Sequence, residues 1–223
     1  MRKLNAIGWP GTAVILCIAF LARLALRLAR GEQDFWTNSY SAYYSLGLRL
    51  ATGHGLCFGD GATTCAWWPP VYPILMAGAA LTPRPYLTIV IGQSLVGAIT
   101  VLCVILLAEH LFDRATGLLA GLLAALYPYF VIHDTALQET STYTCLTAIA
   151  VLLLFYAARE HSRTLAALAG GALGLALLTR ASLLAFVPLA LLWLLCFSGA
   201  LRRSVFEALS SRAGPFRSWS RPG

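Results

Sequence analysis

Acidic residues are scarce in this chain, and most of them gather in two polar stretches. The 223 residues include nine Asp and Glu. Five lie before residue 85 or in the connection "IHDTALQETS": Glu32, Asp34, Asp60, Asp134 and Glu139. Carboxylates collected on one wet face can take a proton from a substrate hydroxyl, although connections between apolar segments are polar in any protein. The group is therefore a candidate acidic rim of a cavity, with solvated loops as the alternative.

Arginines lie close to these acids. Arg23, Arg27 and Arg30 are spaced i, i+4 and i+7, so a helix would present all three on one face. Arg180 stands between two apolar runs in "LLTRASLL". Guanidinium groups bind phosphate oxygens through two parallel hydrogen bonds, which predicts an anion site. Snorkelling of long basic side chains toward lipid headgroups would explain the first three arginines without any ligand.

The stretch "GHGLCFGDGATTCAWWPPVYP" combines cysteines, tryptophans and prolines. Cys57 and Cys65 have seven residues between them, and a disulfide is plausible on an oxidising side of a membrane. Trp67 and Trp68 fit either an aromatic belt at the membrane interface or a platform for sugar rings. The chain has no CxxC, HExxH, P-loop or GxSxG motif and its four histidines are scattered, so we expect no metal site and no cofactor.

The elements that position these residues are membrane helices. The chain is 59% hydrophobic and 11% charged, with a mean hydropathy of +0.74, which predicts an all-α, polytopic membrane bundle. A span needs about 20 apolar residues. Six segments are candidates: 7–28, 86–108, 115–133, 141–158, 164–179 and 182–198. Residues 69–82 are too few and begin with prolines, so we expect them at the membrane surface.

The basic residues indicate how the chain is oriented. With the N-terminus in the cytoplasm, ten Lys and Arg lie inside and six outside, as the positive-inside rule favours. A large loop of about residues 30–85 then faces outward, and residues 39–55 are expected to form an amphipathic interfacial helix. Residues 199–223 are expected to be a disordered, basic cytoplasmic tail. The net charge of +7 lies in short clusters without interleaved aromatics, so no nucleic-acid partner is expected.

The serial order of these features resembles the N-terminal half of the GT-C membrane glycosyltransferases, which include protein O-mannosyltransferases and lipid A aminoarabinose transferases. The similarity rests on "YYSLGLRLATGHG", "WPPVYPILMAGAAL" and "LGLALLTRASLLAFVPLALL", and covers residues 7–198 as one transmembrane domain. It implies a hexosyl- or pentosyltransferase that uses a polyprenyl-phosphate sugar and an acceptor at the outer face of the cell membrane. Because such enzymes usually continue through more helices, we expect a truncated chain or half of a split enzyme.

The resemblance also implies roles for single residues. Asp34 is expected to be the catalytic base, with Glu32 as its substitute. The donor phosphate is assigned to the arginines, namely Arg23, Arg27, Arg30 and Arg180. Binding of acceptor or sugar is assigned to Tyr43, Tyr44, Trp67, Trp68, Asp134 and Glu139. The competing hypothesis is a membrane protein without catalysis, either a transporter fragment or a lipid-binding subunit.

Overall fold

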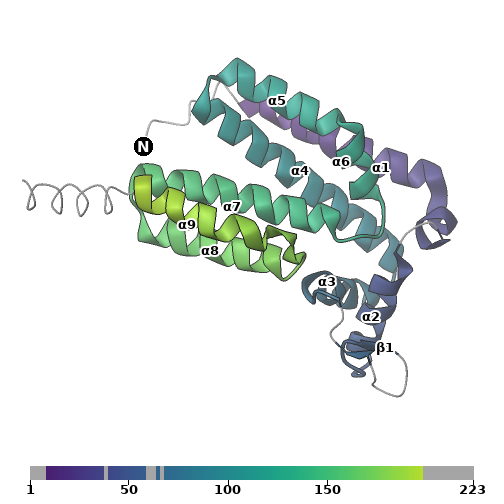
Figure 1. The fold of residues 1–223 in the computed structure, drawn as a ribbon. Helices are drawn as coiled ribbons and strands as arrows, with labels where there is room; N and C mark the ends of the chain where they lie inside the picture. The colour runs from purple at the N-terminus through teal and green to yellow at the C-terminus, as the bar shows by residue number, and fades with distance from the viewer. Residues whose placement is uncertain (1–8, 38–39, 59–63, 66–67, 198–223) are drawn as a thin grey trace, which may run out of the picture.

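The computed structural model describes residues 9–37, 40–58, 64–65 and 68–197, and these are almost entirely helical (Figure 1). The helices are α1 (Trp9–Thr37), α2 (Ser41–Ala51), α3 (Val71–Ala80), α4 (Pro85–Leu111), α5 (Arg114–Leu126), α6 (Pro128–Thr135), α7 (Thr140–Glu160), α8 (Arg163–Leu177), the 3-10 helix η1 (Ala181–Ala185) and α9 (Phe186–Phe197). Two strands of two residues each, β1 (Cys57–Phe58) and β2 (Thr64–Cys65), pair antiparallel. The expected all-α architecture is confirmed.

The number of spans is lower than the six that hydropathy suggested. In the described residues α1, α4 and α7 are long and apolar enough to cross a membrane, and α5 with α6 makes a fourth if this pair, bent by 50°, is one span. Pro128 explains the bend, because the residue before a proline avoids helical dihedrals and Tyr127 is extended (φ −62°, ψ 117°). Helix α8 has only 15 residues. Its length of about 22 Å is less than the thickness of a hydrocarbon core, about 30 Å.

The long helices form a bundle of two groups. Helices α1, α4 and α5 lie together on one side and α7, α8 and α9 on the other, with α4 packed on α7 between them (Figure 1). The first group closes over Ile15, Ala19, Val101 and Ile105. Gly121 of α5 permits the close approach to α4, since a Cβ there would come within 2.7 Å of Ile105 Cδ1.

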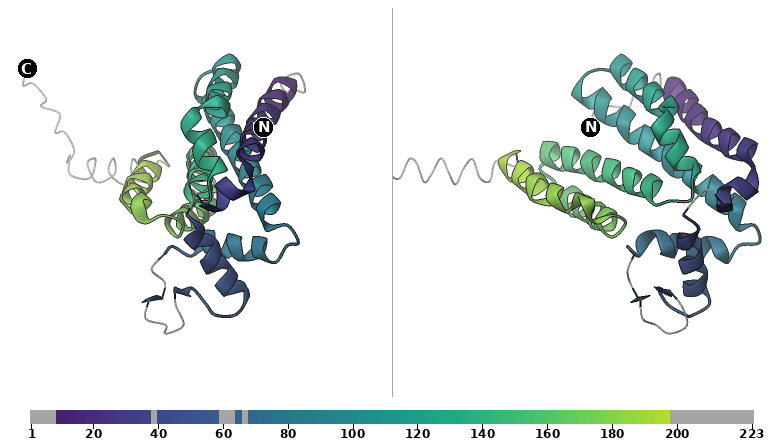
Figure 2. Two further views of the ribbon diagram at one scale, coloured as in Figure 1. Left: turned by 90° about the vertical axis from the view of Figure 1, so that its right-hand side faces the viewer. Right: turned by 45° about the vertical axis from the view of Figure 1, so that its right-hand side comes forward.

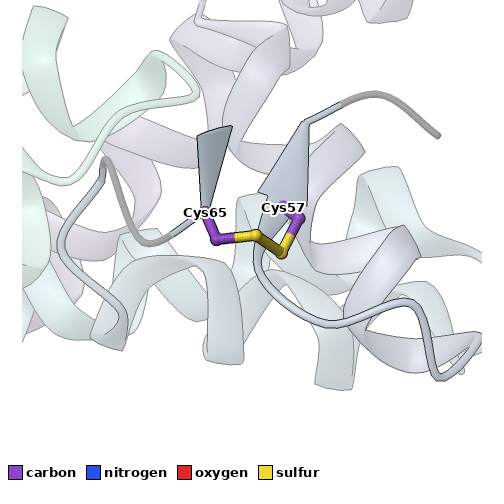
Figure 3. Close-up of a disulfide and its surroundings, with 2 residues drawn as sticks. All are labelled: Cys57 and Cys65. Carbon is purple, nitrogen blue, oxygen red and sulfur yellow. A yellow bond between two sulfur atoms is a disulfide. The ribbon is translucent and has the colours of Figure 1, made fainter. Parts of the chain in front are cut away.

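A smaller unit of α2, α3 and the strand pair sits at one end of the bundle (Figures 1 and 2). Helix α2 lies within the predicted interfacial segment, and α3 has only 10 residues, as its length in the sequence suggested. The strands are linked by a disulfide between Cys57 and Cys65, with an S–S distance of 2.07 Å (Figure 3). The unit is joined to the bundle by an apolar cluster that includes Phe35, Tyr43 and Leu137.

Candidate active site

A polar cavity of about 440 Å³ opens where the α2–α3 unit meets the bundle. Five parts of the chain line it: the start of α2, the residues before α3, helix α6, the junction between α6 and α7, and the residue before η1. One backbone contact helps to bring these parts together. The N–H of Val71 donates to Leu178 O (3.4 Å), which ties the start of α3 to the end of α8 and so places Trp68 and Arg180 at the same cavity.

Aromatic side chains form much of the cavity wall. Tyr43 meets Trp68 edge to face at a centroid distance of 4.2 Å, and it meets Tyr72 in the same way at 4.9 Å. Tyr129 and His133 lie one turn apart on α6, with their ring centroids 4.0 Å apart. Flat apolar faces beside polar groups are the surface on which the C–H face of a sugar ring can pack.

The chemistry of the cavity centres on Glu139. Burial raises the pKa of the Tyr43 hydroxyl, and the adjacent Glu139 carboxylate raises it further, while Arg180 opposes the shift. Tyr72, behind Tyr43, also has a raised pKa because of burial and then Glu139. Both hydroxyls therefore stay protonated and neutral across the physiological range. Glu139 is the only acidic residue that lines the cavity in the described part of the chain.

Arg180 supplies positive charge to the same cavity. Its side chain is exposed, and its guanidinium carbon lies 5.9 Å from the centroid of the Tyr143 ring. Gln138 completes the polar lining and contacts His133 through the ring Nδ1 and the backbone oxygen. A cation, an acid and aromatic faces thus share one cavity, an arrangement that suits a sugar linked to a phosphate.

Arg23 and Asp134 were expected to bind ligands, but the structure pairs them with each other. Arg23 Nε lies 2.6 Å from Asp134 Oδ2, and the two residues are 0% and 7% exposed. Arg23 Nη1 also donates to Ala19 O and Ala125 O. Neither side chain lines the cavity. The two charges neutralise each other inside the bundle, because an unpaired buried charge is very costly, and the predicted roles of both residues in ligand binding stay predictions.

Arg27 and Asp34 form a second pair nearby, with 2.7 Å between Arg27 Nη2 and Asp34 Oδ2. Gly31 makes this possible, because its positive φ of 80° kinks α1 and turns Asp34 back toward Arg27. Arg27 is 2% exposed, so its guanidinium is shielded from solvent in this structure, whereas the Asp34 side chain keeps 34% exposure. Neither residue lines the cavity.

The remaining predicted site residues lie apart from the cavity or outside the described residues. Arg30 and Glu32 are exposed near the end of α1, where Glu32 accepts a hydrogen bond from Trp36 Nε1 (3.1 Å). Tyr44 packs on Trp36 at a centroid distance of 4.7 Å. Trp67, like Asp60, lies outside the described residues.

The sequence interpretation missed several cavity residues. Tyr129, His133 and Gln138 belong to the stretch "PYFVIHDTALQ", which we expected to end a straight span and enter a short loop. Pro128 was a usable signal, since proline favours the first turn of a new helix. A helix begun there places Tyr129 and His133 on one face, at i and i+4.

A comparison of the sequence with protein-family models places the chain among the membrane glycosyltransferases of the GT-C type. A protein-family model described as dolichyl-phosphate-mannose-protein mannosyltransferase matches residues 68–210, and the chain belongs to this family. The resemblance found in the sequence is thereby confirmed. All cavity-lining residues except Tyr40 and Tyr43 lie within the matched range. Searches of curated proteins and of solved structures found no match.

Proposed function

We propose that the protein transfers a sugar from a polyprenyl-phosphate carrier to a hydroxyl acceptor at the outer face of the cell membrane. The observation that carries this proposal is the meeting of Arg180, Glu139 and an aromatic wall in one cavity. The family match supports it, since dolichyl-phosphate mannose is a sugar held on a lipid phosphate. The partners are then the lipid-linked donor, the bilayer and an acceptor whose identity is open.

The donor half of the reaction falls to Arg180 and the aromatic side chains. Negative charge grows on the phosphate as its bond to the anomeric carbon breaks, and a preorganised guanidinium stabilises that charge. Arg180 lies between α8 and η1, at the end of two apolar helices, where a lipid phosphate would sit at the membrane surface. Tyr43 and Trp68 provide the face on which the sugar ring packs.

The acceptor half requires a base within hydrogen-bond reach of the hydroxyl proton. We assign this role to Glu139, whose carboxylate takes the proton while the acceptor oxygen bonds to the anomeric carbon. Asp34, which the family resemblance favoured, remains the competing candidate, because it is paired with Arg27 and its side chain keeps 34% exposure. Its position outside the cavity lining is the reason for preferring Glu139.

The proposed orientation places the N-terminus in the cytoplasm and the α2–α3 unit outside. The distribution of Lys and Arg supports it. The disulfide between Cys57 and Cys65 also supports it, because disulfides persist on the oxidising side of a membrane. The cavity would then open at the outer membrane surface.

Transfer assays in proteoliposomes test the proposal. The purified chain is reconstituted with a panel of radiolabelled polyprenyl-phosphate sugars, and the wild type is compared with Glu139→Gln, Asp34→Asn and Arg180→Met. Removing a general base lowers kcat by roughly 100-fold or more, so Glu139→Gln is expected to lose activity to that degree. Glu160→Gln, an exposed acid at the far end of α7, is the matched control and should retain activity.

Each outcome of this assay bears on a different part of the proposal. Loss of transfer in Asp34→Asn with activity kept in Glu139→Gln would move the base to Asp34. Full activity in Arg180→Met would remove Arg180 from the donor site. No transfer by folded wild-type protein with any donor in the panel would contradict catalysis by this chain and favour a lipid-binding subunit.

A further inference from the structure

The junction between α6 and α7 carries residues that line the cavity, although the junction itself is not helical. Helix α6 ends at Thr135 and α7 begins at Thr140, so the backbone between them lies outside regular structure. The last carbonyl groups of a helix have no partner within it and must find one elsewhere. His133, Gln138 and Glu139 lie in or beside this segment and line the cavity.

Three long side chains from other helices bind this part of the chain, two of them at carbonyl oxygens and one at a carboxylate. Arg23 of α1 binds the Asp134 carboxylate at 2.6 Å. Arg27, also of α1, donates from Nη1 to Thr135 O (3.4 Å), and Gln93 of α4 donates from Nε2 to Ala136 O (2.9 Å). Three consecutive residues, the last two of α6 and the first of the junction, are thus held from the core of the bundle.

The three donors are well placed to act as fixed supports. Arg23, Arg27 and Gln93 are 0%, 2% and 5% exposed, so water does not compete for their hydrogen bonds. Gln93 Nε2 also donates to the Tyr72 hydroxyl (3.0 Å), and that ring packs on Tyr43 in the cavity wall. A buried hydrogen bond is electrostatically stronger than an exposed one, and a shared network restrains its members together.

The next residues of the junction are anchored as well. Leu137 is 0% exposed and packs in the apolar cluster with Phe35 and Tyr86. The chain therefore changes from buried at Leu137 to cavity-lining at Gln138 and Glu139 within two residues. The backbone that leads to Glu139 is therefore held on its core side directly before it reaches the cavity.

We propose that Arg23, Arg27 and Gln93 form a clamp that holds residues 134–136 and so positions Glu139 in the cavity. This assigns Arg23 and Arg27 to positioning in place of binding phosphate. The expected effect of the clamp on the rate of transfer rests on the proposed function, whereas its expected effect on the mobility of residues 134–136 does not. The clamp residues touch no substrate and act through Glu139.

Gln93→Met is the most direct test, because it keeps the length of the side chain and replaces the amide that donates to Ala136 O and Tyr72. Ser94→Ala is the matched control: Ser94 is the next residue of α4, is equally buried, and its hydroxyl donates only to Val90 O of its own helix. Amide hydrogen exchange is measured by mass spectrometry on the full chain in nanodiscs. Gln93→Met is expected to speed exchange of the peptide covering residues 134–141 about 10-fold, and Ser94→Ala to leave it unchanged.

The same proteins are then assayed for transfer. A carboxylate displaced by about 1 Å can cost up to 100-fold in rate, so Gln93→Met is expected to lower kcat by 10-fold to 100-fold with little change in KM for the donor. Unchanged exchange of residues 134–141 in Gln93→Met would overturn the clamp, whatever the activity. Faster exchange with unchanged kcat would overturn its role in positioning the base. If the wild type transfers no sugar, the proposed function fails and the exchange result alone decides on the clamp.

Discussion

Gly97 leaves the space in which the buried ion pair between Arg23 and Asp134 forms. A Cβ at this position would lie 2.6 Å from Asp134 Oδ2 and closer still to Arg23 Nε. Both atoms belong to charged groups inside the bundle, so neither can move into water. Gly97→Ala must therefore separate the two charges or push α4 away from α1 and α6.

The size of the effect follows from two opposing contributions. Breaking a buried ion pair costs about 3–5 kcal/mol, because the charges are left without compensation. Replacing Gly by Ala inside a helix returns about 1 kcal/mol through lower chain entropy. The net loss of about 2–4 kcal/mol corresponds to a fall in Tm of roughly 4–16 °C for a chain of this length.

Thermal unfolding in detergent micelles, followed by tryptophan fluorescence, measures this loss. Gly92→Ala is the matched control on the same helix, since a Cβ there would meet no atom within 4 Å. The control should keep or slightly raise the Tm through the same gain in helix propensity. Equal unfolding temperatures for Gly97→Ala and Gly92→Ala would refute the argument that the ion pair needs this space.

Three further predictions concern the α2–α3 unit and a helix end. Because the pKa of the Tyr43 hydroxyl is raised in the folded protein, the unfolded chain loses the hydroxyl proton at a lower pH than the folded chain does. The free energy of unfolding should therefore fall above about pH 10. Tyr43→Phe should make this fall smaller when unfolding is measured from pH 8 to 11. Cys57→Ser and Cys65→Ser should each make the segment between them more sensitive to limited proteolysis, while the bundle unfolds at nearly its usual temperature; a large loss of bundle stability would contradict the peripheral position of the strands. Asp113 caps α5 and accepts a hydrogen bond from the backbone N–H of Thr116, which lowers the pKa of the Asp113 carboxyl. The stability that this cap contributes should therefore disappear as pH falls below about 4. Asp113→Ala should lack this contribution at every pH.

The sequence by itself determined the membrane class, the two short helices and two members of the aromatic wall, Tyr43 and Trp68. Apolar runs and helical spacing are local properties, so α2 and α3 could be located from residues 39–55 and 69–82 alone. Glu139 and Arg180 were also found in this way, because each is an ionisable residue between apolar segments. The serial order of these local features was enough to predict the family that the match to residues 68–210 confirmed.

Only the tertiary structure decided which charged side chains pair with each other inside the bundle and which line the cavity. Arg23 and Asp134 are 111 residues apart in the chain, and no local pattern predicts that they pair. Arginines spaced along one helix face look equivalent in sequence, yet α4 and α6 cover Arg23 and Arg27 and leave Arg30 exposed. The bend at Pro128 is different, because proline is a local signal that hydropathy, a measure only of how apolar a segment is, does not register. Helices that are distant in sequence bury some charged side chains and supply their partners. The buried pairs can only support the fold around the cavity, whereas the charged side chains left at the cavity can contact a substrate.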